Sequence, residues 1–267
     1  MTLVTLLDAA HAAVSAKPDD DRLRLRFYER LADGELFLLL AEESRGTTFS
    51  PRIFDLEDGP VVLVFDNEDR LARFSGGIAP YAALPGRVIA QAMKGQGIGL
   101  GVNLGVAPSS MMLPPEALDW LAIALETTPE AVEARPESFH PPKGLPEALL
   151  EGLDAKIARA TGLATGVLLA GVTYEGGRRG HLLAFLDAAP GAEAALARAA
   201  SEALVFSGVE AGEMDVVFLQ ASSPVAQAME RVAVRFDLPA DAPAIAPLAA
   251  DARSAPGMDP SRPPRLR

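Results

Sequence analysis

The side chains best suited to acid–base or metal chemistry in this sequence are its three histidines, His11, His140 and His181. They are too far apart to bind one metal ion from a single helix or hairpin, and the chain has no cysteine to supply a thiolate ligand or a thiol nucleophile. His181 is the best placed for a functional role, because Tyr174, Arg178 and Arg179 lie in the same predicted hairpin. These four residues are the candidate ligand contacts.

This hairpin is predicted over residues 167–187, where two apolar runs flank a Gly-Gly pair. A two-residue turn places His181 opposite Val172 and beside Tyr174 and Arg179 on one face of the sheet. One interpretation is a half-buried strand histidine among polar neighbours, and the other is a pocket around His181, Tyr174 and Arg179. The first is favoured, because a general base needs an orienting carboxylate and a nearby substrate. The two arginines near the hairpin tip also suit a small anion.

Two further motifs resemble sites but lack the required pattern. The glycine run GQGIGLGVNLG does not match G-x-G-x-x-G and follows a predicted helix, so it predicts a packing strand with one bare face. Ser109-Ser110 lies in the loop APSSMM without the G-x-S-x-G elbow, and such hydroxyls usually cap or end an element. The sequence therefore predicts no catalytic residue, no cofactor-binding residue and no metal ligand.

The chain has 267 residues, and its net charge of −12 is spread along its length. This length suits one large domain or two ordinary ones. An acidic surface repels phosphate backbones and anionic headgroups, so neither nucleic acid nor a membrane is an expected partner. No stretch reaches membrane-spanning length, and the apolar first residues carry no positive n-region, which predicts a cytoplasmic protein.

Periodicity in the first 126 residues predicts helices over 3–16 (capped near Thr2), 20–33 and 67–74 (capped by Asp66 or Asn67), and further helices after Pro85 and Pro114. It predicts strands over 36–40 and 95–102. The hairpin FDLEDGPVVLVFD at 54–66 has an Asp-Gly pair at its turn. Since Pro60 cannot donate a backbone hydrogen bond, the predicted loop has four residues, Glu57–Pro60, and pairs Leu56 with Val61. Apolar side chains on both faces predict that this hairpin is covered on both sides.

Trp120 lies on the side of its predicted helix that is opposite the core residues Leu118, Leu121 and Leu125. A large aromatic ring in that position predicts an interface with the other domain or with a second subunit, which leaves a homo-oligomer open. Trp120 is the candidate interface residue.

Residues 127–143 contain four prolines and little apolar content, which predicts a linker between domains at 1–126 and 144–238. Seven prolines and few large apolar residues predict a disordered tail over 239–267. The predicted fold class is α+β, with two domains that are each a small, mainly antiparallel sheet packed with helices.

The chain resembles the N-terminal domain of the SseB family, named for enhanced serine sensitivity, in the runs FDLEDGPVVLVFDNEDRLARF, AALPGRVIAQAM, GIGLGVN and MMLPPEALDWL. It resembles the family's C-terminal domain in GVTYEGGRRGHLLAFLDAAPG and ALVFSGVEAGEMDVVFL. The resemblance covers most of residues 20–238 and implies a bacterial, soluble, two-domain α+β protein. It implies no catalytic residues, because the family name records a phenotype rather than an activity.

These features favour a non-enzymatic cytoplasmic protein that binds a partner protein or a small metabolite, linked through the resemblance to amino-acid (serine) metabolism. The alternative is an enzyme or a ligand-gated regulator with a pocket around Tyr174, Arg179 and His181. A purely structural protein that forms elongated oligomers is a third hypothesis. No cofactor is expected.

Overall fold

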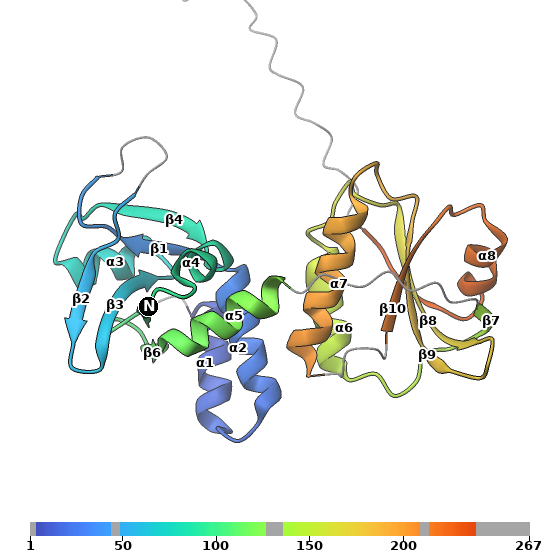
Figure 1. Cartoon of the computed structure of the whole chain (residues 1–267), viewed down its shortest axis with the longest axis horizontal. Coiled ribbons are helices and arrows are strands. Elements are labelled where there is room, and N and C mark those ends of the chain that lie inside the picture. The colour runs from blue at the N-terminus through green and yellow to red at the C-terminus, as the bar shows by residue number, and fades with distance from the viewer. Residues whose placement is uncertain (1–3, 44–48, 127–135, 209–213, 239–267) are drawn as a thin grey trace, which may run out of the picture.

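The computed structural model describes residues 4–43, 49–126, 136–208 and 214–238, and it contains two α+β units (Figure 1). We call residues 4–126 the N-terminal half and residues 136–238 the C-terminal half. Each half has one sheet that is antiparallel apart from one parallel pair of strands, which confirms the predicted α+β class. The predicted tail at 239–267 lies outside the described residues. Among the described segments, no helix combines the length and the apolar character needed to cross a membrane.

The strands of the N-terminal half are β1 (Glu35–Leu39), β2 (Ile53–Leu56), β3 (Gly59–Phe65), β4 (Tyr81–Pro85), β5 (Gly99–Val102) and β6 (Met111–Leu113). They form a sheet in the order β4-β1-β3-β5-β6, with β2 also paired to β3. The helices are α1 (Leu6–Ala16), α2 (Asp21–Asp33), α3 (Glu68–Ser75), α4 (Gly86–Met93) and α5 (Pro115–Glu126). One face of the sheet packs against α1, α2, α4 and α5, and the other packs against α3.

The central strand β3 explains this layering. Its side chains from Val61 to Phe65 are all buried, and they alternate between the core under the four helices and the core under α3. The prediction that the hairpin is covered on both sides is therefore confirmed for β3. It is wrong for β2, where Ile53 and Leu56 remain about half exposed.

The turn between β2 and β3 is tighter than the sequence predicted. Leu56 pairs with Gly59, which leaves a two-residue loop instead of the four residues Glu57–Pro60. Gly59 adopts a φ of 118°, which a glycine tolerates, and it flanks the turn in place of Pro60. Pro60 falls at the next pair of the ladder, where an antiparallel sheet needs no backbone hydrogen bond between the two residues. The error shifts the register by two residues, so every side chain keeps its predicted face.

Helix starts follow the local capping chemistry. The N-cap of α1 is Thr5, whose side chain and that of Asp8 form a capping box, so this helix begins later than the cap predicted near Thr2. Of the two predicted caps of α3, Asp66 and Asn67, the structure has Asn67, whose side chain accepts a hydrogen bond from the backbone of Arg70.

The glycine strand is shorter than predicted. Gly95 and Gly97 lie in the preceding turn with positive φ, and β5 begins at Gly99. At Gly101 a Cβ would lie 2.5 Å from Cδ2 of Leu63 and 2.7 Å from Cδ1 of Leu104. The bare face therefore allows close packing of neighbouring leucines.

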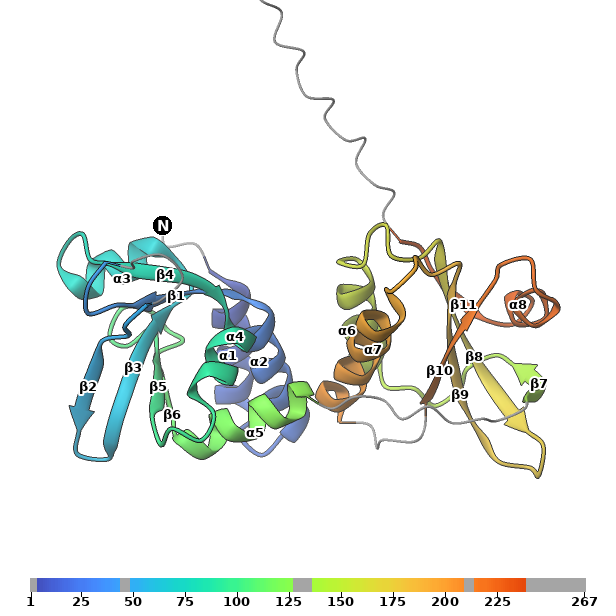
Figure 2. The ribbon, with the colours of Figure 1, turned by 45° about the horizontal axis from the view of Figure 1, so that its top comes forward.

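The strands of the C-terminal half are β7 (Pro136–His140), β8 (Gly166–Tyr174), β9 (Arg179–Leu186), β10 (Met214–Leu219) and β11 (Val234–Phe236). Their order is β10-β9-β8-β11, with β7 paired to β8. The helices are α6 (Glu147–Ile157), α7 (Glu193–Ser207) and α8 (Pro224–Glu230). Figure 2 shows α6 and α7 on one face of the sheet and α8 on the other, in agreement with the two cores that they cover.

The predicted linker at 127–143 is only partly described, since 127–135 lie outside the described residues. Its residues Pro136–His140 are strand β7 of the second sheet, which corrects the prediction. Pro136 stands first in this strand, where a missing N–H is tolerated, and Phe139 packs against the core under α8. Packing of Phe139 and pairing with the edge of β8 therefore make this segment a strand in spite of its proline content.

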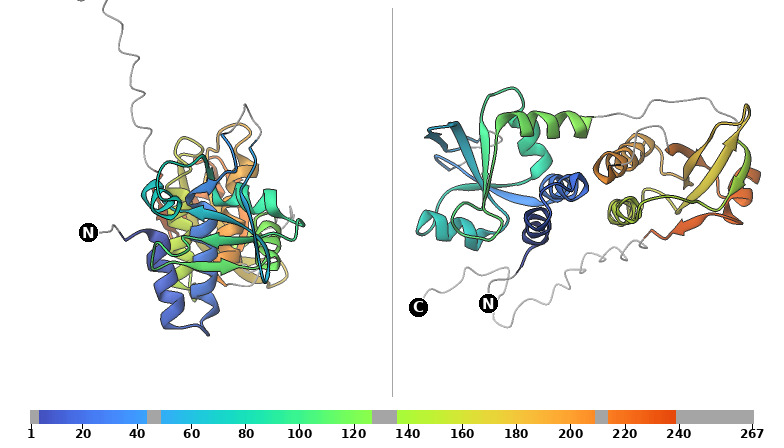
Figure 3. Two further views of the ribbon diagram at one scale, coloured as in Figure 1. Left: turned by 90° about the vertical axis from the view of Figure 1, so that its left-hand side faces the viewer. Right: turned by 90° about the horizontal axis from the view of Figure 1, so that it is seen from below.

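The two halves meet through helices. Figure 3 shows α2 beside α7, and these helices and the pair α5 and α7 are in contact. Phe206 of α7 is buried with the core residues of the N-terminal half. Its ring lies 6.4 Å from that of Trp120, which is also 5.1 Å from Tyr28. One aromatic side chain of the C-terminal half thus completes the core of the N-terminal half.

Candidate functional site

The four candidate ligand contacts of the second hairpin lie on opposite faces of the sheet. Tyr174 pairs with Arg178 through a backbone hydrogen bond of 2.8 Å, and Gly171 pairs with His181. The loop therefore has three residues instead of two, and this one-residue shift reverses the relative facing of the strands. Tyr174 and Arg178 lie on the face under α8, whereas Arg179 and His181 lie on the other face. The predicted grouping of Tyr174, Arg179 and His181 is wrong.

Tyr174 and Arg178 form a closed group with Asp215 of β10. The hydroxyl of Tyr174 donates a hydrogen bond to Asp215, and Arg178 donates one to the same carboxylate at 2.7 Å. The guanidinium of Arg178 lies 4.1 Å from the centre of the Tyr174 ring. Burial, together with the hydrogen bond to Asp215, raises the pKa of Tyr174. Tyr174 therefore stays protonated at neutral pH and links β8 to β10 across β9.

His181 has a backbone partner, since its Nε2 lies 3.1 Å from the carbonyl oxygen of Lys143. Arg179 is exposed on the same face. In the described parts of the chain, no group of three or more His, Asp and Glu side chains is placed to hold a metal ion.

A different set of charged side chains does converge, at the contact between the two halves. We define the interface cluster as Glu29 and Asp33 from α2, Arg87 from α4, Lys156 from α6 and Glu202 from α7. The Lys156 Nζ lies 2.9 Å from Glu202 Oε2, 3.2 Å from Asp33 Oδ2 and 3.9 Å from Glu29 Oε1. Arg87 donates two hydrogen bonds to Glu202, at 3.0 and 3.1 Å, and another to Asp33. Each half therefore neutralises carboxylates of the other.

Burial and pairing compete at these groups. Only 6% of the Lys156 side chain and 3% of the Glu202 side chain are exposed. Burial acts to raise the pKa of Asp33, but Lys156 and Arg87 outweigh it and lower this pKa. Burial raises the pKa of Glu29 against the opposing charge of Lys156. The cluster thus shifts the pKa values of its two α2 carboxylates in opposite directions.

The interface cluster borders a hollow of about 300 Å³. Its charged lining consists of Asp33, Arg87, Lys156, Arg159, Arg198 and Glu202. Alanine and leucine side chains of α7 and of the segment that follows α6 complete the wall. Arg159 Nη1 lies 3.3 Å from Asp33 Oδ2. A second hollow of about 550 Å³, between α4, α5 and α7, shares Arg87 and Arg198 with the first. These two arginines therefore stand between two adjoining hollows.

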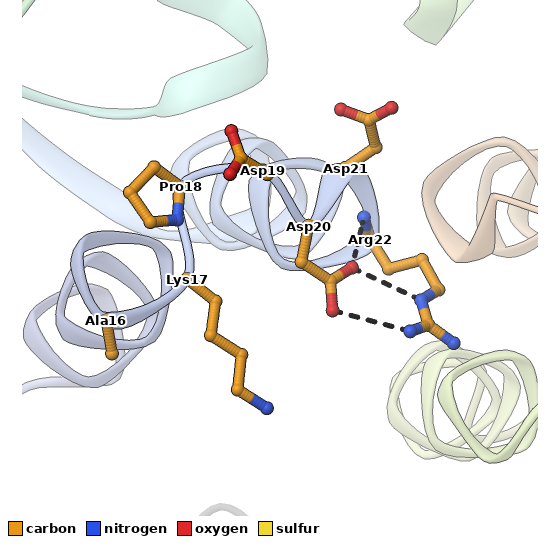
Figure 4. Close-up of a pocket in the computed structure, with 7 residues that line it drawn as sticks. All are labelled: Ala16, Lys17, Pro18, Asp19, Asp20, Asp21 and Arg22. Carbon is orange, nitrogen blue, oxygen red and sulfur yellow. Dashed lines mark hydrogen bonds and ion pairs between the residues drawn. The ribbon is translucent and has the colours of Figure 1, made fainter.

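The larger hollow at the α1–α2 turn is a weaker candidate. Seven consecutive residues, from Ala16 to Arg22, line it (Figure 4). Arg22 points back to Asp20 and donates two side-chain hydrogen bonds to it, and this carboxylate also caps α2. Its acidic groups thus already serve the turn, and no second segment of the chain lines the hollow.

A second charged group is sealed inside the N-terminal half, and we define it as the inner cluster: Asp8, Asp66, Arg70, Asn103 and Ser109. Arg70 is fully buried and contacts Asp8 and Asp66. Asn103 donates to Ser109 at 2.9 Å, and Ser109 donates to Asp8. These bonds tie α1, α3 and the loop after β5 together, so Ser109 has a structural role.

Sequence reasoning missed both clusters. Lys156 lies on the helix face that also carries Leu149 and Leu153, and Glu202 is buried beside Ala203 on α7. A charged residue on the apolar face of a predicted helix was the available signal. Its partners come from distant segments, so the sequence could not pair them.

The fold and this site describe a two-part α+β protein with a charged hollow between its parts. Residues 7–120 match the family model of the SseB protein N-terminal domain. Residues 7–120 therefore form an SseB N-terminal domain. The resemblance of residues 144–238 to the family's C-terminal domain stays a prediction. No curated protein and no solved structure matched the chain.

Proposed function

We propose that this chain is a non-enzymatic binding protein that takes up a small metabolite in the hollow beside the interface cluster. The observation that carries the proposal is that both halves contribute charged side chains to one hollow. Small-molecule sites favour contacts between domains and combine apolar walls with a few polar groups. The hollow has both properties.

The cellular context of this proposal comes from the family. The SseB name refers to enhanced serine sensitivity, so we place the ligand in amino-acid metabolism and the protein in the cytoplasm. The enzyme hypothesis built on Tyr174, Arg179 and His181 has lost its geometric basis, because these residues lie on opposite faces of the sheet.

A thermal-shift screen of the purified chain tests the proposal. The panel contains amino acids, organic acids, nucleotides, sugars and polyamines. A ligand at about one hundred times its dissociation constant adds roughly 2.7 kcal/mol to the free energy of unfolding, which shifts the melting temperature measurably. Stabilisation by one chemical class supports the proposal, and a blank panel overturns it.

The second candidate function is binding of a partner protein through α5. Trp120 remains 39% exposed and Ile123 56% exposed on the side of α5 that faces away from its core residues. Partly exposed aromatic and aliphatic side chains favour contact with another protein. Light scattering on the chain and on an Ile123→Ser variant tests the homo-oligomeric form, which requires a larger mass for the parent chain than for the variant.

A further inference from the structure

We call the hollow of about 300 Å³ beside the interface cluster the interface hollow. Its charged side chains differ in how far they are exposed to solvent. The carboxylates of Asp33 and Glu202 and the ammonium of Lys156 are almost completely buried. The guanidinium side chains are more open, since Arg159 is 58% exposed and Arg198 is also exposed. A molecule that enters the hollow therefore meets arginine side chains first.

The lining also has an excess of positive charge. Four cationic side chains and two carboxylates face the hollow, in a chain whose net charge is −12. A cationic hollow within an otherwise acidic surface attracts anions locally and leaves the rest of the surface repulsive to them. This contrast favours a small anion over an extended polyanion.

Hydrogen-bond donors remain available in the hollow. Arg198 has no ion pair with any described residue, and Arg159 has one, between its Nη1 and Asp33 Oδ2 at 3.3 Å. Each guanidinium carries five N–H groups in a planar fork that matches a carboxylate or a phosphate. Arg87 is different, because Glu202 and Asp33 already occupy both of its terminal nitrogens. It therefore neutralises these two carboxylates at the wall of the hollow.

We propose that the interface hollow binds a small organic anion, carrying a carboxylate or a phosphate group, through Arg159 and Arg198. This inference rests on the proposed function and specifies its ligand class. Arg159 lies just after α6, Arg198 belongs to α7, and Arg87 of α4 closes the hollow from the N-terminal half. The anion therefore binds where the halves meet and stabilises their contact.

Isothermal titration calorimetry with succinate and with inorganic phosphate tests the inference and separates the two anionic groups. We expect saturable binding of at least one of them. We expect Arg198→Gln to weaken that binding by about ten- to a hundredfold, the usual loss for a charge-assisted hydrogen bond. Arg159→Gln is an independent second variant. Both side chains are exposed, so neither substitution threatens the fold.

Arg231→Gln is the matched control, because Arg231 is an exposed arginine at the C-cap of α8 that lies outside the hollow. It removes the same charge and should leave the dissociation constant unchanged within about twofold, the range of a screened distant charge. Equal weakening by Arg198→Gln and Arg231→Gln would show a diffuse charge effect and overturn the site.

Neutral and cationic probes separate failure of this inference from failure of the proposed function. If glucose or putrescine binds and neither anion does, the chain is a binding protein but the ligand class is wrong. If none of the four probes binds and the wider screen is blank, both proposals fail. If an anion binds equally well to the parent and to both hollow variants, the binding function stands and the assigned residues are wrong.

Discussion

The inner cluster and the interface cluster are both built from carboxylates paired with buried cations, but they differ in what surrounds them. In the inner cluster, Arg70 is fully enclosed, and all its partners come from the N-terminal half. In the interface cluster, Lys156 and Glu202 pair with residues of the other half, and a hollow opens beside them.

This difference suggests different roles for the two clusters, one in the stability of the fold and the other in ligand binding. A sealed ion pair cannot regain water unless the domain unfolds, so removing one partner leaves a buried charge without compensation. A cluster between two halves can regain water if the halves separate. A ligand that enters beside it changes the balance of charge without unfolding either half. We therefore propose that the inner cluster stabilises the fold and that the hollow beside the interface cluster binds the ligand.

The largest effect should come from Arg70→Met. This change leaves Asp8 and Asp66 buried without their cation, and we expect it to lower the free energy of unfolding by about 3–5 kcal/mol. Urea unfolding followed by circular dichroism measures the loss. Arg73→Gln in the same helix is the control, because Arg73 is exposed and should change stability by less than about 0.5 kcal/mol. Similar losses in both variants would remove the structural role of the inner cluster.

Lys156→Met should have a smaller effect of a different kind. It removes the cation shared by Asp33 and Glu202, but these carboxylates can regain water when the halves separate. We expect a loss of about 2–3 kcal/mol, below that of Arg70→Met. Small-angle X-ray scattering should show a larger radius of gyration. Lys143→Met, at an exposed lysine before α6, should leave it unchanged. An unchanged radius in Lys156→Met would contradict the view that this cluster joins the halves.

Acid should act on the inner cluster. Burial acts to raise the pKa of Asp8, but hydrogen bonds from Arg70, Ser109 and Thr5 outweigh it and lower the pKa from 3.8 to about 2. Because the folded-state pKa is the lower one, the ionised carboxylate contributes stability above about pH 4. That contribution, roughly 2 kcal/mol, disappears as the pH falls toward 2. Urea unfolding at pH 6 and pH 2.5 measures it. Asp8→Asn should show a shallower decline, and an identical decline would place the titrating group elsewhere.

The smallest effect should come from Arg26→Gln. Arg26 pairs with Glu151 of α6 at 2.5 Å, but both side chains are partly exposed to solvent. Exposed pairs contribute between zero and about 1 kcal/mol, and salt screens them. We expect less than 1 kcal/mol in urea unfolding, falling further in 0.5 M salt. A larger loss would mean that surface pairs also hold the halves together, and the contrast with Lys156 would be lost.

Much of the fold was accessible from the sequence because local signals specify it. Asn67 as a cap, the apolar run of β3 and the core face of α5 were each predicted from spacing and side-chain type. The registers of the two hairpins were not predicted correctly, because each register depends on which residue closes the turn. At Gly59 the error was two residues and harmless, whereas before Arg178 it was one residue and separated the predicted ligand contacts.

The candidate site was not accessible from the sequence for a different reason. Lys156, Asp33 and Arg87 belong to three helices from two halves, and no single segment shows which charged side chains of the others its own will meet. They come together because α2 packs against α7, while α4 packs against α2 and α6 packs against α7. Trp120 was noticed as an interface residue, and its ring lies beside Phe206 of α7 close to this cluster.

The most direct test of the central claim is an NMR titration of the arginine side-chain Nε–Hε signals with succinate and with phosphate. Binding in the hollow beside the interface cluster requires saturable shifts for Arg159 and Arg198 and no shift for Arg70 of the inner cluster. Unchanged signals for Arg159 and Arg198, or shifts spread evenly over exposed arginines such as Arg231, would contradict it.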